Sequence, residues 1–181
     1  TLDANTTGSI DANSVTTITG SIEEINTAYA SNGITGLGNS AVTVTTSSSV
    51  SELNTLDGTT TGVITATVTE TDTATLKTLT GTNNVYSITI TDSSIAATDH
   101  NSIDSKTTGS IDANSVTTIT GSIEEINTAY ASSGITGVGN EAITLADTTV
   151  TATQLKTLDN NTTGAIDTAS VQTITGSIEE I

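Results

Sequence analysis

Apolar and polar residues alternate in several short runs along the chain. In residues 64–69, Ile, Ala and Val take every second position and Thr stands between them. A period of two combined with β-branched residues is typical of a half-buried strand, so we expect the aliphatic side chains to point inward and the threonines outward. Runs of this kind cover residues 41–45, 64–69, 88–91 and 143–145.

Other segments have helical spacing. Ile22 and Ile25 would share one face of a helix that has Ser21 as N-cap and Glu24 as its capping-box partner, and Gly33 is the expected end. We predict an amphipathic helix of about two to three turns there. Shorter segments contain two Leu residues three positions apart, which fits one or two helical turns or a compact loop. These pairs are Leu53 and Leu56, Leu76 and Leu79, and Leu155 and Leu158.

The segments recur along the chain. Residues 6–31 are identical to residues 107–132, an offset of 101, and a third copy begins at Thr162. Asp, Asn and Gly residues followed by Thr-Thr-Gly separate the segments and predict turns. The order within one unit is therefore strand, loop, short helix and turn.

The aliphatic residue that follows each Thr-Thr-Gly-like turn marks a smaller unit. The markers are Ile10, Val42, Ile64, Ile88, Ile111, Ile143 and Ile166. Their spacings are 32, 22, 24, 23, 32 and 23 residues. We interpret these as units of about 23 residues, with an insertion of about nine residues in the units that begin at Ile10 and Ile111.

A unit this short cannot fold alone. Burying about five aliphatic side chains contributes at most about 10 kcal/mol, whereas ordering costs about 1 to 2 kcal/mol for each residue. We therefore predict an α/β solenoid of strand and short-helix repeats with one parallel sheet, and an all-β solenoid is the alternative. Residues 1–181 are expected to form a single tandem-repeat segment of a longer array, because neither end has the polar outer face of a capping repeat.

Composition narrows the classes of partner that the chain could bind. The chain has a formal charge of −17 and only three Lys or Arg residues, which argues against nucleic acid and anionic membrane surfaces. No apolar run reaches the length of a transmembrane helix, so no membrane insertion is expected. The absence of Cys excludes disulfides and thiolate metal sites.

No catalytic constellation is recognisable, and we predict that the protein is not an enzyme. His100 is the only histidine, and it aligns with Leu53, Leu76 and Leu155 of other units. We interpret it as a substitution at a core position. No glycine-rich phosphate-binding motif is present either.

Acidic residues at recurring positions suggest a weak calcium site as the one cofactor to consider. The candidate ligands are Asp3, Asp57, Asp104, Asp159, Asp11 and Asp112. Stacked units would place such oxygen ligands in columns, as Ca²⁺ requires. The other interpretation is that these residues form turns and caps by bonding local backbone N–H groups.

Outward threonines suggest an ice- or glycan-binding surface as a further alternative. The pairs Thr43/Thr45, Thr65/Thr67 and Thr89/Thr91 would align over three successive units, but later units lack the pattern. Exposed Thr is also simply favourable in strands.

The segments LNTLDGTTTGVI (53–64), LKTLDNNTTGAI (155–166) and VTTITGSIEEINTAYASNGITGLGN (15–39) resemble the Thr- and Asp-rich tandem repeats of giant exported and cell-surface proteins of marine cyanobacteria. The resemblance implies an extracellular or cell-surface location and a long structural or adhesive array or filament. The partners would be neighbouring repeats of the same chain or other copies of it. The resemblance implies no catalytic residue.

Overall fold

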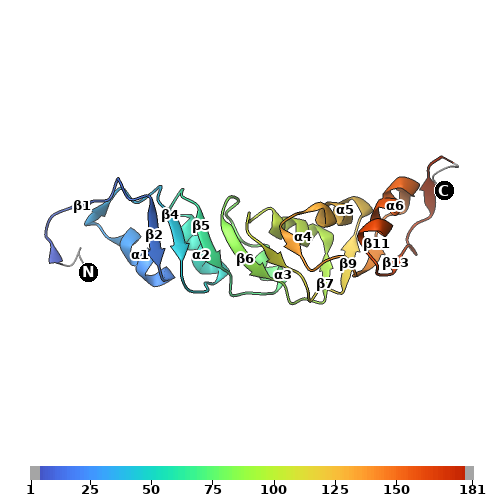
Figure 1. The fold of residues 1–181 in the computed structure, drawn as a ribbon, viewed down its shortest axis with the longest axis horizontal. Coiled ribbons are helices and arrows are strands. Elements are labelled where there is room, and N and C mark those ends of the chain that lie inside the picture. The colour runs from blue at the N-terminus through green and yellow to red at the C-terminus, as the bar shows by residue number, and fades with distance from the viewer. Residues whose placement is uncertain (1–4, 178–181) are drawn as a thin grey trace.

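The computed structural model describes residues 5–177, which form an elongated molecule (Figure 1). Its elements follow one another along the long axis from the N-terminal to the C-terminal end. The described helices are α1 (Ile22–Ala30), α2 (Val50–Asp57), α3 (Thr73–Leu76), α4 (Ala97–Asp104), α5 (Ile123–Ala131) and α6 (Ala152–Asn161). None of these helices combines the length and the apolar character that a membrane span requires.

Short strands lie between the helices and pair only in parallel. They are β1 (Ile10–Asp11), β2 (Thr17–Gly20), β3 (Ile34–Thr35), β4 (Ala41–Val44), β5 (Ile64–Thr67), β6 (Val85–Thr89), β7 (Ser94–Ala96), β8 (Ile111–Asp112), β9 (Thr118–Gly121), β10 (Ile135–Thr136), β11 (Ala142–Leu145), β12 (Thr149–Thr151), β13 (Ile166–Asp167) and β14 (Thr173–Thr175). We call each stretch that contains one helix and the strand or strands before it a layer. Parallel pairing joins a strand to one in an adjacent layer, because the intervening helix and turn return the chain to the same edge.

The strands form four sheets instead of the one predicted. The orders are β1-β3, β10-β8-β6-β5-β4-β2, β13-β11-β9-β7 and β12-β14. Strand β6 explains part of this arrangement, because its first half pairs with β5 and its second half pairs with β8. The residues of a strand that pair with the layer before it are therefore not always those that pair with the layer after it.

The predicted unit boundaries at Ile10 and Val42 are wrong. Ile10 pairs with Ile34, and Val42 pairs with Ile18, so the step between paired residues is 24 in both cases. The spacing of 32 is therefore not an insertion of nine residues. It arises because this layer has two strands, and the strands are too short for a clear alternation to reveal them. Val42 and Ile64, Ile88 and Ile111, and Ile143 and Ile166 are direct pairs. The predicted steps from Ile64 to Ile88 and from Ile111 to Ile143 are wrong, because Thr65 pairs with Val85 and Ile111 pairs with Ile135.

The mixed α/β class is confirmed, and the all-β alternative is wrong because the Leu-rich segments are helices. Helix α1 begins after Ser21, whose side chain accepts from the Glu24 N–H while the Glu24 carboxylate accepts from the Ser21 N–H. The same capping box starts α2, α5 and α6. Helix α1 ends at Ala30, earlier than Gly33, and α6 is longer than α1.

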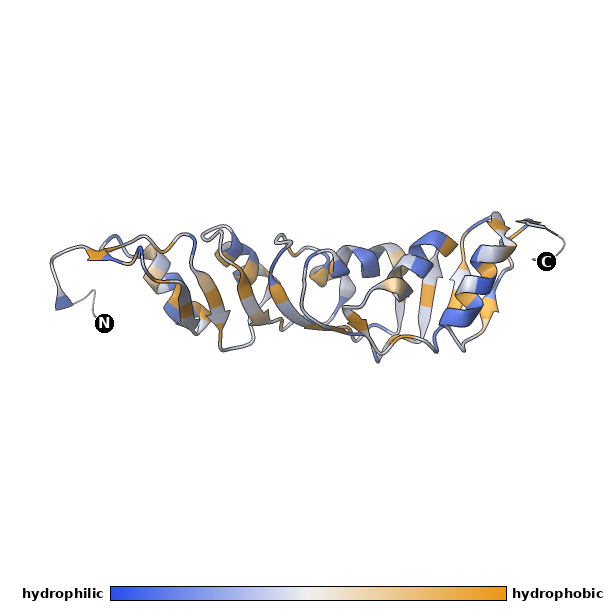
Figure 2. Cartoon of the chain, turned by 45° about the horizontal axis from the view of Figure 1, so that its top comes forward, coloured by the Kyte–Doolittle hydropathy of each residue, from blue (hydrophilic) through white to orange (hydrophobic). Residues whose placement is uncertain are grey.

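The core is a continuous line of aliphatic side chains. Hydrophobic segments are spread along the whole length of the molecule instead of gathering at one place (Figure 2). The fourth residue of each helix from α1 to α5 is buried in this core, and Ile25, Leu53, Leu76 and Ile126 are at most 1% exposed. Such a core needs side chains of similar size in every layer, which the Ile-, Val- and Leu-rich composition supplies.

Candidate functional site

Three Thr-Thr-Gly turns each connect a layer to the one before it. Thr107 Oγ1 accepts from the N–H groups of Tyr86 (2.8 Å) and Gly109 (2.8 Å) and donates to the Tyr86 carbonyl (3.0 Å). Thr60 and Thr162 donate in the same way to the carbonyls of Ser40 (3.2 Å) and Glu141 (2.9 Å). All three threonines are buried. The first Thr of the motif is therefore an interlayer contact as well as a turn residue.

The glycine of the motif allows the two backbones to approach closely. A Cβ at Gly109 would overlap the Tyr86 carbonyl, and one at Gly62 or Gly164 would overlap the carbonyl of Ser40 or Glu141. Glycine is required because the neighbouring backbone occupies the space that a side chain would take. The sequence indicated these residues only as turns. Their recurrence before an aliphatic residue was the signal that they also hold layers together.

The predicted calcium ligands lie apart from one another. Asp11 and Asp112 accept from the backbone N–H groups of Asn13 (2.9 Å) and Asn114 (3.0 Å) two residues later. The strand partners of Asp112 are Thr89 and Thr136, so it is not part of a column of carboxylates.

The remaining candidates are held by different partners. Asp57 accepts from the Asn84 amide (2.8 Å), and Asp104 accepts from the Ser132 hydroxyl (2.9 Å). Asp159 lies on the exposed side of α6, and Asp3 lies outside the described residues. Across residues 5–177 no group of three or more His, Cys, Asp and Glu side chains is placed to hold a metal ion.

Several acidic residues instead cap helices in the preceding layer. Asp147 accepts from the first N–H of α5, at Ile123 (2.7 Å), and Asp92 accepts from the first N–H of α3, at Thr73 (2.7 Å). Glu70 does the same for α2 at Val50 (2.9 Å). A carboxylate at a helix N-terminus satisfies an unpaired N–H and faces the positive end of the helix dipole. These three carboxylates thus have a structural use between layers that the sequence does not reveal.

His100 is placed in the core, as predicted. It is the fourth residue of α4, it is 0% exposed, and both of its ring nitrogens lack a hydrogen-bond partner among the described residues. Burial lowers the pKa of the imidazole, and the Asp104 and Glu141 carboxylates oppose this effect only in part.

Glu141 is a second buried ionisable residue, and it replaces Ser40 of the first copy. Its Oε2 accepts from the Tyr130 hydroxyl (2.9 Å) and the Gly139 N–H (2.8 Å), while Oε1 has no partner among the described residues. Burial raises the pKa of the Tyr130 hydroxyl. The Ser-to-Glu difference between two nearly identical segments is the signal of this residue in the sequence.

Tyr86 is another buried residue with an ionisable side chain. Its hydroxyl accepts from the Asn84 amide (2.9 Å), which also donates to Asp57 (2.8 Å). Burial and the nearby Asp57 charge raise the pKa of Tyr86 to about 12. Asp57 and Asn84 also line a polar groove of about 290 Å³ at the turns that precede β5 and β6. The polar groups of Asp57, Asn84 and Tyr86 are hydrogen-bonded to each other, which indicates a structural network.

The predicted threonine array is only partly formed. Thr19, Thr43 and Thr65 lie side by side in β2, β4 and β5, but the next strand places Val85 beside Thr65. Thr89 pairs with Asp112 and does not extend this column. A three-residue column is a small surface, and the alignment of Thr89 with Thr65 that the sequence suggested is wrong.

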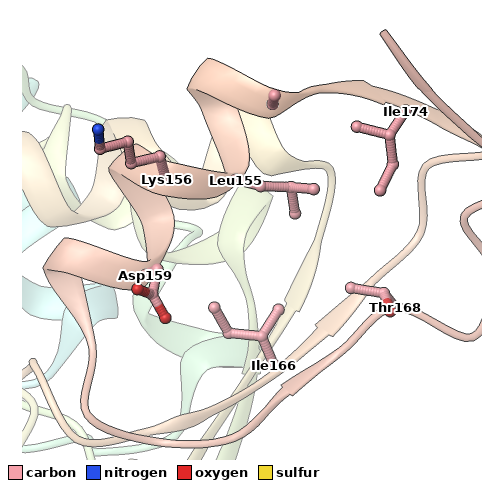
Figure 3. Close-up of a pocket in the computed structure, with 7 residues that line it drawn as sticks. Leu155, Lys156, Asp159, Ile166, Thr168 and Ile174 are labelled. Atoms are coloured by element: carbon pink, nitrogen blue, oxygen red, sulfur yellow. The ribbon is translucent and has the colours of Figure 1, made fainter. Parts of the chain in front are cut away.

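A more apolar groove of about 440 Å³ lies at the C-terminal end of the described chain. Leu155 of α6 and Ile166 and Ile174 of β13 and β14 point into the same space, and Lys156 and Asp159 lie at its edge (Figure 3). It has no convergent polar groups of the kind that orient a small substrate.

Comparisons of the chain with protein-family models, with curated proteins and with solved structures give no match in any of the three.

Proposed function

We propose that the chain is a non-enzymatic structural or adhesive segment, an α/β solenoid within a large extracellular or cell-surface protein or filament. The observation that supports this most is the parallel pairing of strands 20 to 24 residues apart, which continues from β1 to β14. A molecule built from such layers can grow in length without changing its cross-section.

The polar groups of the described residues support the same proposal. Threonine hydroxyls, Asp and Glu carboxylates and glycines hold turns, helix N-termini and adjacent layers, and we find no set of them that converges on a substrate. The net charge of −17 favours a soluble, self-repelling surface. No specific contact favours the calcium-, ice- or glycan-binding alternatives.

Small-angle X-ray scattering of the 181-residue chain tests the architecture. We expect an elongated particle, and a variant that contains residues 6–106 twice should be longer by about 20 Å at unchanged cross-section, because four further strands add about 4.8 Å each. A compact particle, or a variant that grows mainly in cross-section, would contradict the solenoid. The location is tested separately by asking whether antibodies against the chain label intact cells of the source organism.

A further inference from the structure

The two long copies of the repeated segment stop being identical at one exposed turn. Residues 6–31 match residues 107–132, and the next position is Asn32 in the first copy and Ser133 in the second. Glycine follows in both copies, and no other asparagine of the sequence precedes a glycine. The first copy therefore has an Asn-Gly pair that the second copy lacks.

This pair lies in the connection between α1 and β3. Helix α1 ends at Ala30 and β3 begins at Ile34, so the pair belongs to neither element. The Asn32 side chain is exposed and has no hydrogen bond to any described residue. Its counterpart Ser133 is also exposed, although a described layer precedes that copy. The exposure of this turn thus does not depend on the preceding layer.

The backbone nitrogen that follows Asn32 is outside the helix and the strand pairing. The Gly33 N–H donates to the Ser31 hydroxyl (3.0 Å), which is the one partner found for it among the described residues. Glycine has no Cβ that would hinder the approach of its nitrogen to the preceding side chain. An unbonded side-chain amide and a sterically open backbone nitrogen therefore lie next to each other.

The asparagines that precede serine are restrained by hydrogen bonds. Asn13 and Asn114 each donate from the side-chain amide to the aspartate two residues earlier (2.6 Å). Asn101 lies within α4 and donates to a backbone carbonyl of α5 (2.9 Å). The backbone nitrogen that follows Asn39 donates to the Leu37 carbonyl (3.0 Å). In each case the fold holds one of the two groups that are open at Asn32.

An aspartate-glycine pair in α2 is restrained at both groups. The Gly58 N–H donates to the Asn54 carbonyl (3.2 Å) at the end of the helix. The Asp57 carboxylate accepts from the Asn84 amide (2.8 Å). Among these pairs of small residues, the connection between α1 and β3 leaves the side chain and the following nitrogen least restrained.

We propose that Asn32 is a site of spontaneous deamidation, which goes beyond the proposed function and does not depend on it. Asparagine is among the thermally labile residues of proteins. The Gly33 nitrogen loses its proton to solvent and attacks Asn32 Cγ. The side-chain amide gains a proton and leaves as ammonia, which closes a succinimide ring. Water then opens the ring at either carbonyl and leaves aspartate or isoaspartate at position 32.

The reaction alters the first copy of the segment and not the second. Both products add a negative charge, and isoaspartate also lengthens the backbone between α1 and β3 by one methylene group. This connection places the Gly33 carbonyl against the Ile10 N–H (2.7 Å), so the contact between β1 and β3 changes with it. Serine has no amide to lose, so the copy with Ser133 keeps its original connection.

Peptide mass spectrometry tests the site after incubation of the folded 181-residue chain in mildly alkaline buffer at physiological temperature. Digestion at mildly acidic pH limits deamidation during sample preparation. We expect the Asn32 peptide to gain the mass of an NH2-to-OH exchange and to give separate aspartate and isoaspartate forms. Its rate should exceed that of every Asn-Ser site at least about tenfold, a barrier difference of about 1.4 kcal/mol. A rate at Asn32 no higher than at Asn39 overturns the proposal.

Reciprocal variants test whether the turn itself is responsible. Ser133→Asn creates the same pair in the second copy, where the Gly134 N–H also donates to a serine hydroxyl (3.1 Å). This variant should deamidate at both positions at similar rates, whereas Asn32→Ser should abolish the reaction in the first copy. Asn39→Ser is the matched control and should leave the rate at Asn32 unchanged. A Ser133→Asn chain that does not react at position 133 overturns the role of the turn.

Incubation in urea separates the contribution of the fold from that of the sequence. Unfolding removes the hydrogen bonds of Asn13, Asn101 and Asn114, so the rates at these sites should rise relative to the rate at Asn32. The same ratio of rates in the folded and unfolded chain would overturn the protection that the fold is proposed to give. Circular dichroism before incubation checks that each variant is folded.

Discussion

His100 occupies a position where neighbouring helices have an aliphatic residue. Leu53 and Leu76 fill the same fourth position of α2 and α3, and all three side chains are fully buried. Both imidazole nitrogens lie in the core without a partner among the described residues. A buried polar atom that has lost water without gaining a hydrogen bond lowers stability.

We expect His100→Leu to raise the free energy of unfolding by about 1 to 3 kcal/mol, because it removes these unsatisfied atoms and restores the side chain of the other layers. Urea unfolding followed by circular dichroism measures the change. Leu76→His is the reciprocal variant and should destabilise. Equal stability of the unaltered chain and the His100→Leu variant would show that the imidazole has a partner, such as a buried water.

The same residue makes stability depend on pH. Burial lowers the pKa of His100 in the folded protein below 6.5, so the unfolded chain binds the proton more tightly. The pH-dependent part of the folding stability that comes from His100 is fully present above about pH 6.5. It is lost as the pH falls through this value toward the folded pKa. The stability gap between His100→Leu and the unaltered chain should therefore widen from about pH 7.5 to about pH 5.5. A constant gap would contradict a buried neutral imidazole.

Glycine at a close interlayer contact provides a second prediction at the scale of one residue. Gly109→Ala should destabilise by about 1 to 3 kcal/mol, because the new methyl group overlaps the Tyr86 carbonyl. Gly8→Ala is the matched control, since the surrounding residues 6–31 are identical to 107–132, but among the described residues a Cβ at Gly8 would meet only the Thr6 side chain. Thermal unfolding distinguishes them, and equal effects of the two substitutions would contradict the interlayer role.

At the scale of an element, α2, α3 and α5 each have a cap within their own sequence and one from the next layer. Ser122 and Glu125 form the capping box of α5, and Asp147 adds a bond to the Ile123 N–H. The N–H and hydroxyl of Ser122 lower the pKa of Glu125. The local part of this arrangement can be recognised in the sequence, but the part from Asp147 cannot, because it joins residues 24 apart.

Asp147→Ala should lower stability by about 0.5 to 2 kcal/mol, which is the usual effect of removing an N-terminal cap. Glu124→Ala also removes one negative charge, in this case from the first turn of α5. The structure shows no hydrogen bond of the Glu124 side chain among the described residues, so this variant should have a smaller effect. The stability of both variants is measured by chemical unfolding at moderate salt concentration, which limits the contribution of general charge repulsion to the difference. An equal loss for both variants would mean that net charge, and not the cap, determines the effect.

At the scale of the whole molecule, the high negative charge is distributed and does not converge on one site. We therefore expect millimolar Ca²⁺ and Mg²⁺ to change the melting temperature equally, by screening repulsion. A specific calcium site present at a hundred times its dissociation constant would add about 2.7 kcal/mol, which is roughly 5 to 10 °C for a chain of this size. A calcium-specific shift of that order in differential scanning calorimetry would restore the calcium-binding alternative.

The sequence by itself determined the longer helices α1 and α5, aliphatic core positions and the internal repetition. The capping box and the spacing of Ile located α1, whereas for α2 and α6 the spacing of Leu left helical turns and a compact loop both open. The core position of His100 followed from alignment with Leu53 and Leu76. These features depend on residues a few positions apart, so they can be recognised in one segment of chain.

Only the tertiary structure decided which strands pair and which copy of a repeated segment is covered by an adjacent layer. Strands such as β1 and β3 have two residues, which is too short for alternation to specify a register, and similar Thr-rich segments offer several alternatives. The partners of Thr107 and Asp147 lie in other layers, more than twenty residues away. Val15 and Val116 have identical neighbours in sequence and opposite burial. Burial there is a property of the adjacent layer, and no local pattern contains it.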